Sequence, residues 1–168
     1  MGSQASYSVK PTAAVPDTQL VWAEMAGLYV QFAPMVRLAH LLTGSVAIAE
    51  DVVQDAFIRI APRYAELENP RGYLRTAVVN GCRSYQRGAA RRQVVLQRER
   101  REPTYDAPVV EFFDALKSLK EKERAAIVLR YYCDLPDDEI AALLACAPAT
   151  VRVLVQRALS RLRKVVQT

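Results

Sequence analysis

Apolar residues recur every three or four positions along most of the chain, and no stretch has the strict alternation of a half-buried strand. This spacing predicts a first helix over about 18–43. Pro34 should kink that helix or divide it in two, because proline removes a backbone hydrogen bond. A second helix is expected after Ser45, a candidate N-cap, with Pro62 disturbing its end. Pro70 suits the first turn of a third helix, which ends among arginines.

The second half of the chain carries four more helical patterns, over about 110–119, 122–132, 136–144 and 149–166. Between the two halves, the stretch 88–108 is charged and has no periodicity, which is typical of a flexible linker. The pattern therefore predicts an all-α fold of two small helical domains joined by this linker.

The length of 168 residues agrees with two small domains. We expect a flexible N-terminal tail over 1–17, a first domain over 18–90, the linker over 91–108 and a second domain over 109–168. No apolar run approaches the roughly 18 residues that a membrane span needs, and the N-terminus has no secretory signal pattern. These features predict a cytoplasmic protein without membrane insertion.

The net charge of +5 hides an uneven distribution. Residues 69–101 hold nine arginines and one acidic residue, and residues 147–168 hold five basic residues and no acidic one. Two basic blocks on an otherwise acidic chain indicate a polyanion bound at two places, although solvated helix faces are the simpler alternative. The acidic stretch with Glu50, Asp51 and Asp55 would repel DNA, so its expected partner is a protein.

The residues that support metal or catalytic chemistry are few. Cys82, Cys133 and Cys146 have no CxxC spacing, and the single histidine, His40, is distant from all three in sequence. Each cysteine lies among apolar residues, which favours small buried hydrophobes. The sequence thus predicts no metal, no cofactor and no enzymatic activity.

The strongest local motif is a short helix over 137–144, a tight turn over 145–148 and a longer basic helix. This order is typical of a helix-turn-helix, whose second helix enters the major groove of DNA with its N-terminal residues at the base edges. An ordinary helical hairpin with an arginine-rich face is the alternative. The side chains expected to project toward DNA are Arg152, Val153, Gln156 and Arg157.

Three ordered motifs together resemble the bacterial sigma factors of the extracytoplasmic-function type, group IV of the sigma-70 family. The resemblance covers about 28–166. The matching segments are Leu28 to Gly44 and Ala49 to Phe57 for sigma region 2, and Leu116 to Leu119, Ala126 to Tyr131 and Thr150 to Arg152 for sigma region 4.

The resemblance implies a role for each block of residues. It implies that an acidic face docks on the coiled coil of the largest subunit of core RNA polymerase, through Asp51, Gln54, Asp55, Ile58 and Arg59. It implies that region 4 also touches the flap of the second-largest subunit. The linker is expected to thread through the core enzyme.

The resemblance also implies two DNA-binding surfaces. The residues expected to recognise and melt the −10 element are Arg63, Tyr64, Asn69, Tyr73, Asn80, Arg83, Ser84 and Arg87. The two tyrosines are candidates for base stacking, and a partly buried packing role is the alternative for both. The residues expected at the −35 element are Thr150, Arg152, Val153, Gln156, Arg157 and Arg161. Val153 departs from the polar residue often found there in the family, so its contact would be apolar.

The function that follows is that of a sigma factor, which binds core RNA polymerase and directs promoter-specific initiation. The rival hypothesis is a stand-alone helix-turn-helix regulator that binds duplex DNA unaided. An enzyme with Glu50 and Asp51 as an acid–base pair is a remote third. The expected partners are core RNA polymerase, promoter DNA and, from the resemblance alone, an anti-sigma factor.

Overall fold

The computed structural model describes residues 26–91 and 107–166 of the chain, and within these ranges it is built of helices and turns without a strand. A short helical segment over 26–29 precedes the named elements. These are α2 (Phe32–Thr43), α3 (Val46–Ile60), the 3-10 helix η1 (Ala61–Glu66), α4 (Pro70–Arg91), α5 (Ala107–Lys117), α6 (Glu121–Tyr131), α7 (Asp137–Leu144) and α8 (Pro148–Val166). The prediction of an all-α fold is confirmed.

The prolines act at the helix boundaries that the sequence indicated. The first predicted helix is divided by a turn at residues 30–31, and Pro34 falls in the first turn of α2, where its missing N–H costs no helical bond. The part of that prediction before residue 26 lies outside the described residues. α3 ends at Ile60, and Pro62 lies in the 3-10 helix η1 that follows. Ser45 is the N-cap of α3, but its side chain makes no capping hydrogen bond.

Helices extend into both ends of the aperiodic stretch 88–108. α4 continues through Gly88 to Arg91, and α5 already begins at Ala107. Helix propagation adds one hydrogen bond for each residue fixed, so a helix that is already formed extends into a polar sequence. The rest of the linker, residues 92–106, lies outside the described residues.

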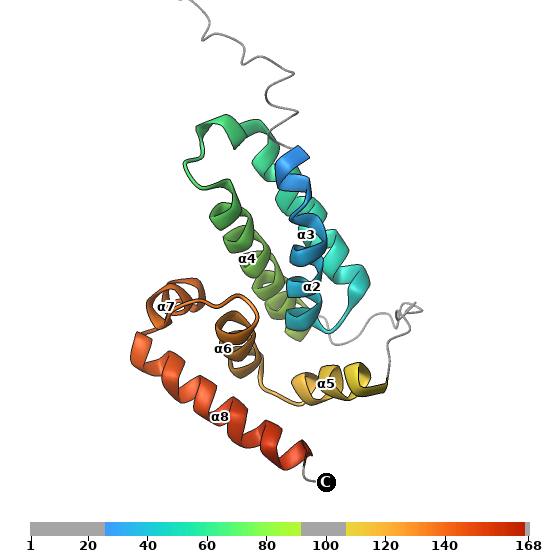
Figure 1. The fold of residues 1–168 in the computed structure, drawn as a ribbon, viewed down its shortest axis with the longest axis vertical. Helices are drawn as coiled ribbons and strands as arrows, with labels where there is room; N and C mark the ends of the chain where they lie inside the picture. The colour runs from blue at the N-terminus through green and yellow to red at the C-terminus, as the bar shows by residue number, and fades with distance from the viewer. Residues whose placement is uncertain (1–25, 92–106, 167–168) are drawn as a thin grey trace, which may run out of the picture.

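The first half of the structure is a bundle of α2, α3 and α4 (Figure 1). Its core consists of residues that are wholly buried, among them Leu38, Val53, Ile60, Leu74 and Val78. α3 and α4 approach closely at Gly81, where a Cβ atom would lie 2.7 Å from Cγ1 of Val52. A larger residue at this position would force the Val52 side chain or the two helices to shift, so glycine suits this close packing.

The second half packs α6, α7 and α8 around buried Leu129, Ile140 and Val151, with α5 against α8. Ala145, which ends α7, has the left-handed conformation with φ 50° and ψ 56°. This conformation turns the chain sharply into α8, as a helix-turn-helix requires. In Figure 1, α8 lies at the outer edge of this half, away from α2, α3 and α4.

The two halves are in contact, which the sequence did not indicate. α4 lies against α7, and α2 lies against α6. Nη1 of Arg83 donates a hydrogen bond to the Leu143 carbonyl at 2.6 Å, and Nη2 donates to the Leu144 carbonyl at 3.3 Å. The guanidinium thus satisfies carbonyls at the C-terminal end of α7, where a positive charge is favoured.

Candidate polymerase-binding and DNA-binding surfaces

The predicted polymerase-binding residues form one face of α3. Ala49, Val53, Ala56 and Ile60 are buried against the rest of the bundle, so the residues between them point outward. The structure brings the whole predicted set together, and every member is exposed: Asp51, Gln54, Asp55, Ile58 and Arg59. Asp55 and Arg59 form an ion pair of 2.7 Å along the helix. The isoleucine, Ile58, is 71% exposed, which leaves an apolar side chain beside the charged ones.

An aromatic group next to this face was missed by the sequence analysis. The ring of Tyr29 stacks on Phe32 with centroids 5.6 Å apart and meets Phe57 edge-on at 6.4 Å. Tyr29 is 68% exposed and Val30 is 71% exposed. Nothing in the local spacing distinguishes these residues from core residues. Their exposure is caused by the turn at residues 30–31, which separates them from α2.

A cavity of about 240 Å³ lies where η1 leads into α4. Its lining consists of Gly27, Leu28, Tyr64, Glu68, Asn69, Pro70 and Arg71. The predicted residues Tyr64 and Asn69 therefore share one hollow. Tyr64 is half-buried against the core, so the packing role applies to it as well. The ring of Tyr64 offers stacking to a base, Asn69 offers hydrogen bonding, and the lining carries one cation, Arg71, and one carboxylate, Glu68.

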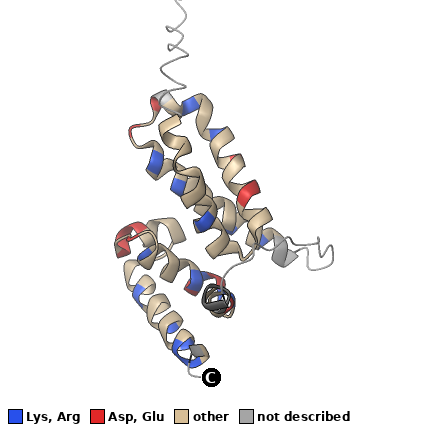
Figure 2. Cartoon of the chain, turned by 45° about the vertical axis from the view of Figure 1, so that its right-hand side comes forward, with Lys and Arg blue, Asp and Glu red and all other residues tan. Residues whose placement is uncertain are grey.

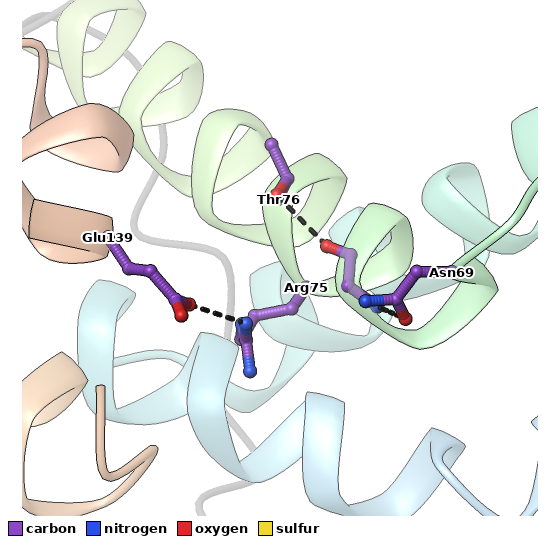
Figure 3. Close-up of polar contacts among 5 residues, drawn as sticks. Asn69, Arg75, Thr76 and Glu139 are labelled. Atoms are coloured by element: carbon purple, nitrogen blue, oxygen red, sulfur yellow. Dashed lines mark hydrogen bonds and ion pairs between the residues drawn. The ribbon is translucent and has the colours of Figure 1, made fainter. Parts of the chain in front are cut away.

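Asn69 also has a structural task. Its Oδ1 accepts a hydrogen bond from the Gly72 N–H at 2.9 Å, which caps the first turn of α4 (Figure 3). Further along the same turn, the Thr76 hydroxyl donates to the Gly72 carbonyl at 2.9 Å. The guanidinium of Arg63 lies 5.9 Å from the ring centre of Tyr73, within the range of a cation–π contact.

The remaining predicted −10 residues follow α4 toward its C-terminal end. Asn80, Ser84 and Arg87 are exposed, and Arg87 donates to the Ser84 hydroxyl at 3.2 Å. Arg83 instead points to α7. Asn80 lines a second cavity, of about 260 Å³, between α4 and α7. Part of the predicted −10 surface thus faces the second half of the protein.

The contact between α4 and α7 includes an ion pair. Nη2 of Arg75 lies 3.2 Å from Oε2 of Glu139, as Figure 3 shows. Arg75 and Arg83 are eight residues apart on α4, and Glu139 and Leu143 are four apart on α7. Both pairs therefore lie along one face of their own helix.

The predicted −35 residues form the exposed face of α8. The apolar stripe with Val151, Val155 and Ala158 is buried, as the helical spacing predicted. The exposed residues are Thr150, Arg152, Val153, Gln156, Arg157 and Arg161. Val153 is 43% exposed, so it offers an apolar surface to solvent on the helix face that was expected to meet DNA.

Arg161 has a partner within the protein. Its Nε lies 3.2 Å from Oε2 of Glu123, whose side chain is only 4% exposed. The same carboxylate oxygen accepts the Lys120 N–H at 3.4 Å and so caps α6. Arg161 therefore joins α8 to α6, a role that the sequence analysis did not foresee.

Arg152 is likewise held by an acidic residue. Nε of Arg152 donates to Oδ2 of Asp137 at 3.2 Å, and Arg130 pairs with the other oxygen of the same carboxylate. Figure 2 shows the acidic start of α7 beside the basic α8. The sequence placed Asp137 in a helix but did not predict its pairing with Arg152 and Arg130.

The three cysteines carry free thiols. Burial raises the pKa of Cys82 to about 12, and it also raises the pKa of Cys133. The expectation of a small buried hydrophobe holds for Cys82, while Cys133 and Cys146 are half-buried. No group of three or more metal-ligating side chains occurs within residues 26–91 and 107–166. None of the helices in these ranges is long and apolar enough to cross a membrane.

The fold and these surfaces define a two-part helical protein with a DNA-binding helix-turn-helix and an exposed acidic face on α3. The family model for sigma-70 region 2 matches residues 28–92, and the model for sigma-70 region 4 matches residues 110–162. The chain belongs to the sigma-70 family, as an RNA polymerase sigma factor of the extracytoplasmic-function type that directs promoter-specific transcription.

Two relatives support this assignment. The RNA polymerase sigma-E factor of Streptomyces coelicolor is 30% identical over 138 residues, which cover 77% of this chain and 78% of the relative. The ECF RNA polymerase sigma factor SigJ of Mycobacterium tuberculosis is 31% identical over 140 residues, which cover 74% of this chain and 45% of that protein.

Solved structures share the fold. The sigma factor RpoE of Bartonella quintana, in complex with the anti-sigma factor NepR, has a TM-score of 0.73 at 24% identity, over 87% of this chain and 98% of that chain. CnrH, in complex with the cytosolic domain of CnrY, has a TM-score of 0.60 at 21% identity, over 90% of each chain.

Proposed function

We propose that the three surfaces divide the work of a sigma factor among them. The exposed face of α3 binds core RNA polymerase, the cavity between η1 and α4 holds a base of the melted −10 strand, and the exposed face of α8 reads the −35 element. The observation that carries this proposal is their coexistence on one chain: an acidic face with exposed Asp51 and Asp55, a hollow with Tyr64, and a basic helix face.

The charges support this division. The acidic residues of α3 are unsuited to a phosphate backbone, whereas five basic residues and no acidic one lie in α8. Basic side chains on both α4 and α8 suit a partner that runs along the whole molecule, as promoter DNA does. A chain with this organisation has no chemical step of its own, since the polymerase supplies the catalysis.

Binding to promoter DNA requires the two halves of the protein to separate from each other. Arg83 is half-buried and donates to two carbonyls of α7. It reaches the −10 DNA only after α4 and α7 separate. We infer that binding to core polymerase and promoter favours the separated arrangement, because both provide new partners for these side chains.

An anti-sigma factor is a further proposed partner. RpoE and CnrH, which share this fold, were each solved with a bound partner protein, and for RpoE that partner is the anti-sigma factor NepR. The exposed apolar residues Tyr29, Val30 and Ile58 offer a surface that either core polymerase or such a partner would bury.

The test of polymerase binding is co-elution with bacterial core RNA polymerase in size-exclusion chromatography. The variant Asp51→Lys/Asp55→Lys should lose co-elution and keep its helical circular dichroism spectrum, because both side chains are exposed. The matched control is Glu66→Lys/Glu68→Lys, which reverses two exposed acidic residues of the same half outside α3. Co-elution of the α3 variant at the wild-type level would overturn the proposed docking face.

The test of base capture is permanganate reactivity of thymines in the −10 region of a promoter bound by the holoenzyme. Tyr64→Ala should reduce reactivity by about fivefold or more, since base–aromatic stacking contributes about 1–3 kcal/mol. Tyr64→Phe should retain it, because the ring alone stacks. Equal melting by the wild-type and Tyr64→Ala proteins would exclude the cavity as the base site.

A further inference from the structure

One acidic residue lies among the basic side chains of the proposed −35 surface. Oδ2 of Asp137, at the start of α7, accepts a hydrogen bond from Nε of Arg152 at 3.2 Å. Its other oxygen, Oδ1, is paired with Nη2 of Arg130 on α6. The side chain of Asp137 is 23% exposed, whereas that of Arg152 is 67% exposed. The carboxylate is thus held between three helices, and the arginine extends from it into solvent.

The Arg152 atom that bonds to Asp137 determines which hydrogen-bond donors of the guanidinium remain available for DNA. A guanidinium is planar and carries five N–H donors in a rigid fork. The bond to Asp137 uses the donor on Nε, at the base of the fork. The two terminal nitrogens, Nη1 and Nη2, then keep donors on the edge of the plane that faces away from Nε. Two parallel donors at this spacing match O6 and N7 of guanine in the major groove.

A free arginine on a helix surface populates many rotamers, and fixing them on binding costs conformational entropy. An ion pair made before DNA arrives removes part of that cost. Asp137 is suited to hold its partner because Arg130 restrains it from the other side. It also lies in the first turn of α7, where a negative charge is favoured.

We propose that Asp137 is a positioning residue for Arg152, and that it directs the Arg152 fork to a guanine at one position of the −35 element. The inference rests on the proposed role of α8 and adds to it the base that is read and the residue that orients the reader. Asp137 itself touches no DNA. Its negative charge near the phosphates lowers overall affinity, so its benefit lies in base discrimination.

The experiment uses the full chain in holoenzyme with bacterial core RNA polymerase. A pool of promoters with a randomised −35 element is transcribed, and the templates of the transcripts are sequenced to give the base preference at each position. The wild-type protein should prefer guanine at one position, and Arg152→Ala should abolish that preference. Asp137→Asn should weaken it at the same position by about fivefold, the lower end of what a bidentate contact contributes.

Asp138→Asn is the matched control. Asp138 is the neighbouring exposed acid in the same turn of α7, and no hydrogen bond or ion pair links its side chain to another of the described residues. This variant removes the same charge and should leave the preference unchanged. A role of Asp137 in stability alone would lower activity on all promoters equally, so the base preference separates positioning from folding.

A second variant covers the case in which Asp137→Asn fails to fold. Arg152→Gln keeps a hydrogen-bonding side chain but has no guanidinium fork, and it should lose the guanine preference, since an amide suits adenine. A retained guanine preference in Arg152→Gln would overturn the proposed fork contact, and a wild-type preference in folded Asp137→Asn would overturn the positioning role. If the wild-type holoenzyme shows no preference at any −35 position, the proposed function of α8 has failed instead.

Discussion

The ion pair between Arg75 on α4 and Glu139 on α7 gives a direct test of the contact between the two halves. The change is Glu139→Arg, which replaces attraction by repulsion across the 3.2 Å contact. Glu139 is outside every proposed DNA-binding and polymerase-binding set, so its effect on domain contact is separable from binding. We expect the variant to shift the protein toward the separated arrangement.

The solvent exposure of this ion pair sets how far the equilibrium between the contacting and separated arrangements should shift. The side chains of Arg75 and Glu139 are 29% and 54% exposed, so solvent screens much of their interaction. A pair of this kind contributes about 0.2–1 kcal/mol, and two like charges at 4 Å in bulk water repel by about 1 kcal/mol. The sum is about 1.5 kcal/mol, which corresponds to a roughly tenfold increase in the ratio of separated to contacting molecules.

The assay is single-molecule fluorescence energy transfer between dyes on the two halves. Ala47 on α3 and Ser160 on α8 are exposed and accept a cysteine each, after Cys133 and Cys146 are replaced by serine. Asp138→Arg is the control, since it makes the same charge change on the adjacent residue. The swap Arg75→Glu/Glu139→Arg should restore the wild-type distribution. An unchanged distribution in Glu139→Arg, or no rescue by the swap, would refute the electrostatic contact.

Three further predictions concern stability. Ala145→Gly should raise the free energy of unfolding by about 0.5–1 kcal/mol in urea titrations, because a φ of 50° strains a residue with a Cβ atom. Its control is Ala142→Gly in the preceding helix, which should lower the free energy of unfolding by about 1 kcal/mol. Glu123→Ala should lower it by about 2 kcal/mol through loss of the cap and the Arg161 pair, and equal urea midpoints would contradict this. The Cys82 thiol is neutral in the folded state, with a pKa of about 12 against 9.0 in the unfolded chain. The preference of the fold for the neutral thiol therefore adds to the free energy of unfolding in full below pH 9, and this stabilisation is lost as the pH rises toward 12. Urea titrations at pH 9 to 12 should show a smaller decrease in the free energy of unfolding for Cys82→Ala than for the wild-type protein.

The helices of this protein were predictable because their causes are local. A period of 3.6 residues, a proline at a boundary and an apolar stripe act within one or two turns. The exposed faces of α3 and α8 followed from the same periodicity. Asp55 and Arg157 were therefore assigned to surfaces before any packing was considered, and both are exposed in the structure.

The contacts that the sequence did not predict have non-local causes. The resemblance to sigma factors implied a −10 DNA contact for Arg83, and in the structure this side chain caps α7, which is 60 residues away in sequence. Arg161 was expected at the −35 element, and in the structure it pairs with a buried acid on α6. A charge run shows that arginines need anionic or polar partners, but it cannot show whether those partners belong to DNA or to another helix of the same chain.

The sequence by itself determined the helices, the helix-turn-helix and the faces that each helix leaves exposed, because these depend on residues a few positions apart. Only the tertiary structure decided that Asp137 holds Arg152, that η1 and α4 enclose a hollow with Tyr64, and that α4 rests on α7. Such contacts arise when helices distant in sequence bury their apolar faces against one another. The side chains that meet at the edges of this core are set by helix geometry in space, which sequence spacing does not encode.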